Sequence, residues 1–411
     1  MGLMRKLYKR IPPVLAHDIA IAAAHYIQGD SPLAEWIRES IHGKYAYEDG
    51  RLRVTLPALY KMDRMEYRNP IGLAAGVDKN GRAVDFFHML GFGFVEVGSV
   101  TQNPIVRERE YFRLPGDQAL INRAKLRNEG VRELAKNLVH QKAYAPVGIN
   151  ITADSGKAGT GKDDAIKDII NSFTACRWAA RFIVLNISCP NTADGRAFQD
   201  PQVLDELLER VMYENQPNDL YFSLWRPILV KLSPDLSDKE LEKIVETCER
   251  HHVNGYVLTN TTQRREGLGL KSPLETVRRI GSGGLSGLPL QQMALDMTKK
   301  VYRLTGGKAP IIGVGGIMDA ESAYARIRAG ASLLEIYTMM VYRMMEKGIG
   351  AGLGAAYELK TGLVRLMQRD GVRSISEIVG ADAQGNAYPL PADIPSPARQ
   401  STAAGTVPLS R

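Results

Sequence analysis

The sequence predicts an α/β fold, a (β/α)8 TIM barrel with an N-terminal helical extension. Eight short apolar runs, each β-branched or containing glycine, recur after about residue 68, and a helical pattern follows most of them. This alternation favours a closed parallel barrel over an open sheet. The chain has 411 residues, of which 44% are apolar, so it can bury a core large enough for one such barrel.

The expected elements follow in chain order. The strands begin near Ile71, Phe94, Val147, Phe182, Ile228, Tyr256, Ile311 and Leu333. The helices are expected over residues 82–90, 131–141, 163–180, 202–212, 238–251, 290–302, 320–329 and 341–346, with one more after Glu358. We assign residues 46–380 to the barrel. Residues 381–411, an end rich in Pro, Ser and Ala, are predicted to be a disordered tail.

Residues 1–45 are predicted to form an amphipathic helical segment. No acidic residue precedes Asp18, whereas four basic residues do, and apolar residues recur among them at helical spacing over residues 3–11. A second helix is expected over residues 14–28, with Leu15, Ile19 and Tyr26 on one apolar stripe. Such helices favour peripheral contact with an anionic membrane surface. The alternative is a helical hairpin packed on the barrel, with its basic side chains solvated.

Several classes of protein are excluded. No stretch approaches the roughly 20 apolar residues of a spanning helix, and His17 and Asp18 interrupt any secretory signal. The three cysteines, Cys176, Cys189 and Cys248, are too far apart for a zinc or iron–sulfur framework, so no metal site is predicted. Their odd, sparse number suits a reducing compartment. No basic patch interleaved with aromatic residues recurs in the barrel, so no nucleic acid partner is expected.

Polar residues follow the strands of the predicted barrel. Because a (β/α)8 barrel carries its site at the carboxyl ends of its strands, these positions predict an active site. They are Lys79, Ser99, Asn150, Asn186, Lys231, Asn260, Gly315 and Tyr337.

The run from Leu185 to Thr192 is the most informative part of this set. Asn186 and Asn191 offer paired donors and acceptors for a flat polar ligand, and Cys189 between them can take or give a proton. A purely structural strand end has little use for these groups, so Cys189 is our candidate catalytic residue.

Glycines at the seventh and eighth strands predict a phosphate site. Residues 311–317 form a strand that opens into glycines, Asp319 can cap the next helix, and Tyr337 and Thr338 follow the eighth strand. Backbone N–H groups can approach a phosphate at this corner of a barrel. A glycine loop over residues 283–287 is expected after strand six. No Rossmann fingerprint opens a βαβ unit, so a mononucleotide fits better than a dinucleotide.

Lys231 ends a buried strand, so its ammonium needs an anionic or strongly polar partner. Beside a flavin ring, a lysine would stabilise the anionic reduced form. Asn150 and Thr259 can satisfy the rest of the ring edge. These residues favour FMN acting on a small planar acid, whereas the structural alternative for Lys231 is a salt bridge at the edge of the core.

These motifs resemble those of the dihydroorotate dehydrogenases, and of the membrane-associated, quinone-using class 2 in particular. The resemblance runs from Ala16-His17 to Arg369-Asp370-Gly371. Its motifs are residues 72–81, Phe112-Arg113-Leu114-Pro115, Gly148-Ile149-Asn150, Asn186 to Thr192, Thr259-Asn260-Thr261-Thr262, Gly283 to Gly287 and Gly313 to Gly316.

The resemblance implies oxidation of (S)-dihydroorotate to orotate in de novo pyrimidine synthesis, with a membrane quinone as acceptor and Cys189 as the base. It also implies peripheral attachment to the cytoplasmic face of the inner membrane, where residues 1–45 would give the quinone access. The implied substrate residues are Lys79, Asn122, Asn186, Asn191, Asn260 and Thr261. The predicted FMN residues are Ala75, Gly76, Lys79, Ser99, Asn150, Asn186, Lys231, Thr259, Ser286, Gly287, Gly315, Gly316, Tyr337 and Thr338.

The chain departs from the family pattern in three places. Cys189 stands where class 2 enzymes have serine, Lys125-Leu126-Arg127 replaces Gly-Phe-Asn, and residues 152–155 replace Gly-Lys-Asn. The two cations near the expected substrate keep open an FMN oxidoreductase for another cyclic or acidic substrate. A non-catalytic FMN-binding paralogue is a third hypothesis, although such a protein would not need Lys79, Asn186, Cys189 and Asn191.

Overall fold

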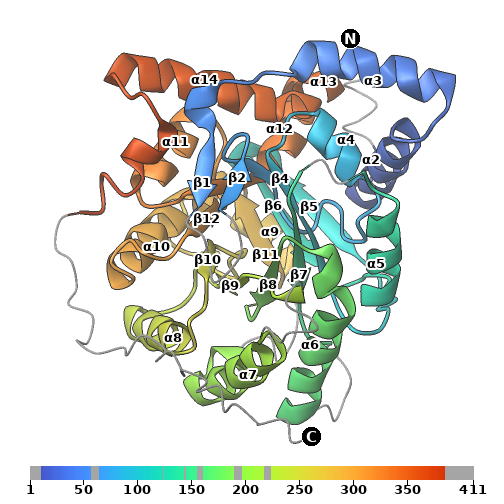
Figure 1. Ribbon diagram of the computed structural model, residues 1–411. Coiled ribbons are helices and arrows are strands. Elements are labelled where there is room, and N and C mark those ends of the chain that lie inside the picture. The colour runs from blue at the N-terminus through green and yellow to red at the C-terminus, as the bar shows by residue number, and fades with distance from the viewer. Residues whose placement is uncertain are drawn as a thin grey trace, which may run out of the picture.

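The computed structural model describes residues 11–56, 64–123, 125–142, 145–154, 161–188, 197–216 and 224–384. Eight parallel strands in these residues close into a barrel, in the order β10-β12-β13-β3-β4-β7-β8-β9 (Figure 1). All eight predicted strands are therefore confirmed, and the fold is the predicted TIM barrel. The strands are β3 (Ile71–Leu73), β4 (Phe94–Val100), β7 (Val147–Ile151), β8 (Phe182–Asn186), β9 (Ile228–Leu232), β10 (Gly255–Leu258), β12 (Ile311–Val314) and β13 (Leu333–Ile336).

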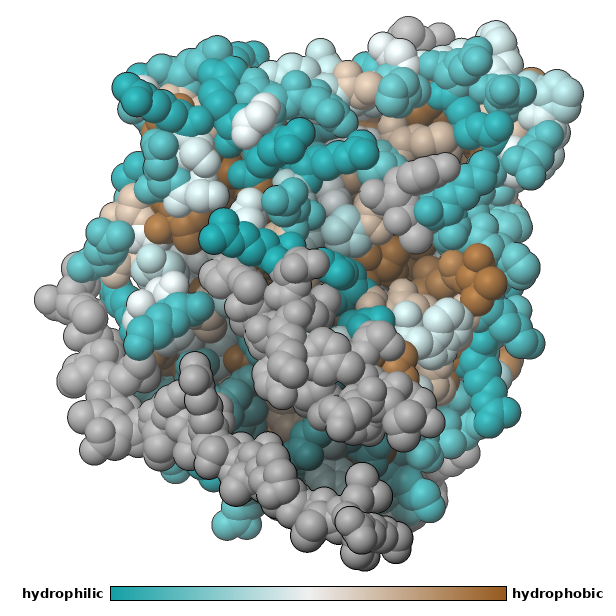
Figure 2. Space-filling view, in the orientation of Figure 1, coloured by the Kyte–Doolittle hydropathy of each residue, from teal (hydrophilic) through white to brown (hydrophobic). Residues whose placement is uncertain are grey.

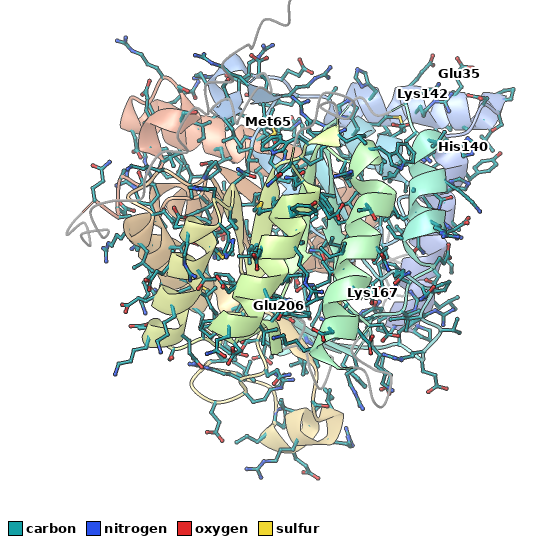
Figure 3. The ribbon with its side chains drawn as sticks, turned by 60° about the horizontal axis from the view of Figure 1, so that its bottom comes forward. Glu35, Met65, His140, Lys142, Lys167 and Glu206 are labelled. Atoms are coloured by element: carbon teal, nitrogen blue, oxygen red, sulfur yellow. The ribbon has the colours of Figure 1, made fainter. Side chains whose placement is uncertain are left out.

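Helices surround the barrel and turn their polar sides outward, as Lys167 on α6 and Glu206 on α7 do in Figure 3. Local capping fixes several helix starts. Ser237 and Glu240 form a capping box on α8, and Asp319 caps α11 as predicted. The surrounding helices are α4 (Val84–Met89), α5 (Val131–Val139), α6 (Lys162–Cys176), α7 (Pro201–Glu214), α8 (Asp238–Arg250), α10 (Gln291–Leu304), α11 (Ala320–Arg328), α12 (Thr338–Lys347) and α14 (Ala355–Asp370).

Aromatic rings fill the amino-terminal end of the barrel. A Cβ atom added to Gly72 would lie 2.2 Å from the Phe94 ring, and one added to Gly148 would lie 2.2 Å from Phe182, so glycine makes room for each ring. The Phe94 and Phe182 ring centroids are 6.2 Å apart, and Tyr67 packs edge-on against Phe94. Tyr67 belongs to a hairpin of β1 (Val54–Leu56) and β2 (Met65–Tyr67). The opposite end of the barrel is left for the site.

A small antiparallel sheet, which the sequence pattern did not predict, lies beside the barrel strands. It contains β5 (Glu110–Leu114), β6 (Ala119–Arg123) and β11 (Gly284–Gly287), with β6 in the middle. The expected glycine loop over residues 283–287 is therefore mostly a strand, and that prediction was wrong. Two short helices, α9 (Leu274–Ile280) and α13 (Ile349–Leu353), were also not predicted.

The N-terminal residues form a pair of helices, α2 (Pro13–Ile27) and α3 (Pro32–Tyr45), that pack beside α4. Figure 1 shows both in blue at one corner of the molecule. Ser31 caps α3, and the Tyr45 hydroxyl donates to the Gly350 carbonyl at 2.7 Å, which ties α3 to α13. The basic residues before position 11 and the predicted tail after residue 384 lie outside the described residues. The division at residues 45 and 380 stays a prediction.

None of the described helices has both the length and the apolar character that crossing a bilayer requires.

Candidate active site

One cavity of about 580 Å³ lies at the carboxyl ends of the barrel strands. Every predicted site residue that the structure describes lines it, except Asn150. These residues are Ala75, Gly76, Lys79, Ser99, Asn122, Asn186, Lys231, Thr259, Asn260, Thr261, Ser286, Gly287, Gly315, Gly316, Tyr337 and Thr338. Residues that lie as far apart in the sequence as Ala75 and Thr338 thus line the same cavity.

Three predicted site residues are not among those named above. Cys189 and Asn191 lie outside the described residues. Asn150 is fully buried behind the wall, where its Nδ2 donates to Glu96 Oε1 at 2.8 Å. Its carbonyl Oδ1 is buried and has no hydrogen-bond partner among the described atoms. In the described residues, no cluster of three or more His, Cys, Asp or Glu side chains could hold a metal ion.

The end of β8 carries a network of amides and hydroxyls. Asn260 Nδ2 lies 3.2 Å from Asn186 Oδ1 and 3.0 Å from the Ser188 carbonyl oxygen, and donates to both. Asn186 Nδ2 in turn donates to Ser99 Oγ at 2.9 Å. Because these bonds join the carboxyl ends of three strands, they fix the orientation of both amides toward the cavity.

Lys79 reaches the cavity from the loop that follows β3. The buried carboxylate of Asp78 holds this loop by accepting the backbone N–H groups of Arg82 at 3.0 Å and Ala83 at 2.7 Å. Lys79 Nζ donates to the Arg127 carbonyl at 3.3 Å. The ammonium therefore lies between the loop after β3 and the segment after β6, where it can meet an anionic ligand.

Two buried carboxyl groups flank the buried ammonium of Lys231. Its Nζ lies 3.0 Å from Glu96 Oε1 and 3.9 Å from Glu335 Oε2. Burial lowers the pKa of Lys231, but Glu96 and Glu335 raise it by more, so the pKa lies above its usual value. Lys231 and Glu335 both line the cavity wall. Lys231 therefore forms an internal salt bridge, as the structural alternative expected. It also lines the cavity, as binding of a ligand requires.

The surroundings of Glu335 favour its neutral form. Burial, and then the negative charge of Glu96, raise its pKa well above the usual value, and Lys231 offsets only part of this. Neither oxygen of Glu335 has a hydrogen-bond partner among the described atoms. If both carboxyl groups were ionised, the three side chains would carry a net negative charge in a dry interior, which a proton on Glu335 removes.

We predict that Glu335→Gln stabilises the protein increasingly as the pH rises. A carboxyl whose folded pKa lies above its unfolded value of about 4.3 binds more protons when folded, so stability falls between these two pKa values by up to ~1.4 kcal/mol per pH unit. The glutamine variant lacks this loss. Thermal unfolding at about pH 5 and about pH 8 checks it. Glu275→Gln, at an exposed position on α9, is the control. An equal shift of Glu335→Gln at both values would contradict a neutral Glu335.

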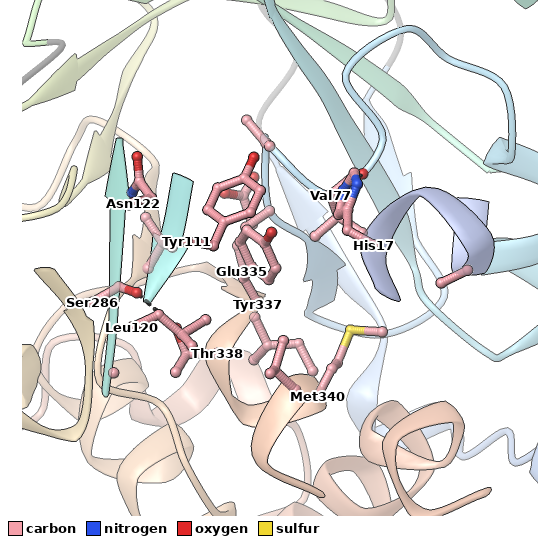
Figure 4. A pocket seen from close by; sticks show the side chains of 18 of the residues that line it. His17, Val77, Tyr111, Leu120, Asn122, Ser286, Glu335, Tyr337, Thr338 and Met340 are labelled. Carbon is pink, nitrogen blue, oxygen red and sulfur yellow. Dashed lines mark hydrogen bonds between the residues drawn. The ribbon is translucent and has the colours of Figure 1, made fainter. Parts of the chain in front are cut away.

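The corner that was predicted to bind a phosphate lies at the ends of β12 and β13. Gly315 and Gly316 have φ values of +97° and +73°, which favour glycine. A Cβ atom added to Gly316 would lie 2.2 Å from Gln291 Cα, so no side chain fits there. The hydroxyl groups of Ser286 and Thr338 hydrogen-bond at 2.9 Å (Figure 4). This corner presents small residues and backbone groups to the cavity, as a phosphate requires.

The other half of the cavity is apolar, and sequence reasoning did not locate it. His17 on α2 hydrogen-bonds through Nε2 to the Val77 carbonyl at 2.8 Å, and burial lowers its pKa, so it is neutral. Figure 4 shows Tyr111 and Tyr337 between His17 on one side and Asn122 on the other. The apolar wall consists of Ile11, Pro13, Ala16, Ile19, Ala20, Ile21, Ala23, Ala24, Ile27, Phe86, Phe87, Met340, Val341, Met344, Ile349 and Leu353.

The unusual segment after β6 contributes an apolar residue to the cavity. Leu126 is buried, lines the cavity and packs against Ile105. Asn128 fixes this turn by donating to the Leu126 carbonyl at 2.7 Å. Lys125 and Arg127 are not part of the cavity wall, and Arg127 is exposed. The two cations that set this segment apart therefore do not face the cavity.

Among the charged residues at or next to the cavity, sequence reasoning missed Glu96 and Glu335. The sequence contains a pattern that could have identified both. Each is a lone acidic residue within an apolar strand, Val95-Glu96-Val97 and Leu334-Glu335-Ile336. A buried strand residue of this kind needs a cation, and Lys231 on another barrel strand is the matching one.

The barrel, the glycine corner and the buried lysine define a class, the flavin-dependent (β/α)8-barrel oxidoreductases. The sequence model of dihydroorotate dehydrogenase matches residues 59–349. The chain belongs to the dihydroorotate dehydrogenase family, so the resemblance seen in its motifs is confirmed.

Curated relatives and solved structures agree. The dihydroorotate dehydrogenase (quinone) of Trichodesmium erythraeum is 36% identical over 379 residues, which cover 90% of this chain and 94% of that protein. The protein of that name from Deinococcus radiodurans is 36% identical and is covered completely, over 91% of this chain. The crystal structure of Eimeria tenella DHODH in complex with ferulenol superposes with a TM-score of 0.76 at 29% identity, covering 91% of this chain and 96% of that one.

Proposed function

We propose that the protein uses FMN to oxidise (S)-dihydroorotate to orotate and passes the electrons to a membrane quinone, as a step of de novo pyrimidine synthesis. The single observation that carries the proposal is the two-part cavity. One continuous space joins a polar end, with Lys79, Asn186 and Asn260, to an apolar end along α2. A polar acid and an apolar acceptor can therefore reach the same cofactor from different sides.

The residues present fit FMN. Lys231 offers a buried ammonium to the ring, and the glycine corner at Gly315 and Gly316 has no room for side chains but suits a phosphate. The bound flavin supplies the two-electron acceptor for the oxidation. Lys79 would bind the carboxylate of the substrate, while Asn122, Asn186, Asn191, Asn260 and Thr261 would hold its ring. Cys189 would remove the proton from C5.

The cofactor and the substrate can be tested together. The purified protein should be yellow, and mass spectrometry of the released group should give one FMN per chain. Under anaerobic conditions, dihydroorotate should bleach the flavin absorbance. FAD or no flavin would refute the cofactor assignment. FMN that dihydroorotate fails to bleach would favour an oxidoreductase for another acid, or a non-catalytic paralogue. The position of Lys125 and Arg127 off the cavity wall gives no support to an altered substrate.

The apolar end of the cavity opens beside an exposed apolar patch. Five large side chains form this patch: Leu15, Ile19 and Tyr26 on α2 are 50%, 52% and 53% exposed, and Leu33 and Trp36 on α3 are 55% and 65% exposed. Figure 2 shows hydrophobic residues in brown over α2. Ile19 belongs to both the patch and the cavity wall. The patch supports peripheral contact with a membrane surface, from which a quinone would reach the cavity. We propose that this surface is the cytoplasmic face of the inner membrane.

We predict that replacing Leu15, Ile19 and Trp36 together with serine weakens binding to vesicles that contain anionic phospholipid by at least about 10²-fold, since inserting each large apolar side chain is worth roughly 1.5–3 kcal/mol. Vesicle cosedimentation measures the effect. The control replaces Trp178 and Tyr213, which are 46% and 71% exposed, with serine. Tyr213 lies on α7, at the bottom of Figure 1, far from α3. Equal binding of both variants would contradict docking through the patch.

A further inference from the structure

A fully buried arginine lies directly behind the glycine corner. Arg326 on α11 is 1% exposed. Its guanidinium donates to the carbonyl oxygens of Gly315 at 2.8 Å and Val314 at 3.3 Å. Longer contacts reach the carbonyls of Gln291 at 3.4 Å and Leu258 at 3.5 Å. One side chain therefore holds the ends of β10 and β12 and the start of α10 together, at the place where the predicted phosphate would lie.

The positive charge of Arg326 has no paired carboxylate. No ion pair to Arg326 occurs among the described residues, and its Nε is buried without a hydrogen-bond partner there. Burial lowers its pKa to about 9, and Asp296 offsets this only in part, so the group is still charged at neutral pH. A buried cation without a counter-ion is costly. An anion at the adjacent cavity wall would supply the missing charge.

The geometry of the peptide connects this cation to the cavity. In a trans peptide the C=O and the following N–H point in opposite directions. The carbonyl oxygen of Gly315 accepts a hydrogen bond from Arg326 at 2.8 Å, so the N–H group of Gly316 points away from the guanidinium. Both glycines line the cavity. Arg326 thus orients the peptide that joins Gly315 and Gly316, and adds its own positive charge behind it.

We propose that Arg326 is a positioning residue that makes this corner selective for a phosphate-bearing flavin over an uncharged one. The proposal rests on the proposed function, because it takes the phosphate of FMN to bind at Gly315 and Gly316. Arg326 does not touch the ligand. It acts through the backbone of the loop and through the field of its charge.

A purely structural role makes a different prediction. If Arg326 only ties α11 to the loops, its replacement should weaken FMN and riboflavin equally, because both share the ring and ribityl groups. If its charge acts on the phosphate, only FMN should bind more weakly. The ratio of the two dissociation constants therefore separates the roles.

The experiment titrates the full-length protein, after removal of its flavin, with FMN and with riboflavin, and follows quenching of flavin fluorescence. The variants are Arg326→Gln, which removes the charge and keeps a donor, and Arg326→Lys, which keeps the charge. Arg328→Gln is the matched control, since Arg328 lies on the same helix but is only half-buried and is paired with Asp382. We expect Arg326→Gln to reduce the preference for FMN on the order of tenfold or more, whereas Arg326→Lys and Arg328→Gln keep most of it.

Equal weakening of both flavins in Arg326→Gln would overturn the proposal and leave a structural role. Loss of the preference in Arg326→Lys would also overturn it, even if the glutamine variant failed to fold. A native protein that binds FMN and riboflavin equally would instead refute the phosphate site on which the proposed function depends. These outcomes distinguish failure of this inference from failure of the function.

Discussion

Replacing Cys189 with alanine should slow the reduction of the flavin by dihydroorotate by a factor of about 10² to 10⁴, the usual contribution of a positioned base. In the sequence, Cys189 directly follows Ser188. The Ser188 carbonyl and the Asn186 side chain are both held by hydrogen bonds from Asn260. The substrate should still bind, since Lys79 and the amides are unchanged. Anaerobic stopped-flow absorbance of the flavin measures the rate.

Two comparisons sharpen this test. An unperturbed thiol has a pKa of about 8.5, far below that of a serine hydroxyl, so Cys189→Ser should keep some activity and reach its highest rate at higher pH than the native enzyme. Cys176→Ala is the control, because Cys176 is buried in α6 and packs in the core. A Cys189→Ala variant that reduces its flavin at the native rate would show that another group removes the proton.

Deletion of residues 1–30 should reduce turnover with a long-chain quinone in vesicles to near background. It removes α2, which forms much of the apolar cavity wall. The barrel should persist, because only Ala16 and Ala24 of α2 are fully buried, whereas α3 keeps its Ser31 cap and its buried Ile41 and Tyr45. Steady-state oxidation of dihydroorotate, measured with quinone-containing vesicles, checks this expectation.

The control for the deletion uses the same protein with a different acceptor. Flavin reduction by dihydroorotate and turnover with a water-soluble dye should change little, since Lys79, Asn186 and Lys231 lie at the polar end of the cavity. Native turnover with the vesicle quinone in the truncated protein would exclude α2 from quinone binding.

The barrel was predictable because each strand is a short apolar run buried on both sides. All residues of β8 and β9 are buried, Lys231 included, so composition alone marks them. The strands β5 and β6 carry no such signal. Most of β5 is only half-buried and contains Glu110 and Arg113, and the sheet is completed by β11, which lies far from β5 and β6 in the sequence. A sheet that depends on long-range pairing does not show in a local pattern.

Much of the polar end of the site could also be read from the sequence, because residues at strand ends converge in a barrel. The orientation of a side chain within a strand could not. Asn150 lies only a residue from the end of β7, yet its amide bonds to Glu96 and it is not among the residues that line the cavity. The direction depends on register and barrel shear, which no single segment encodes. The apolar wall was hidden for a similar reason, since it combines α2, α4 and α12.

The joint position of Ile19, on the outer apolar patch and on the cavity wall, has a consequence for how the enzyme is supplied. An acceptor that reaches the cavity from within a bilayer is never diluted by the surrounding water. Its effective concentration is its mole fraction in the lipid. Adding membrane without quinone would therefore lower the rate of turnover, although the amount of quinone per volume stayed the same. Dihydroorotate, which arrives from the aqueous side, would follow ordinary solution concentrations. The acceptor would then reach the protein by diffusion within the membrane, and the donor would reach it by diffusion in solution.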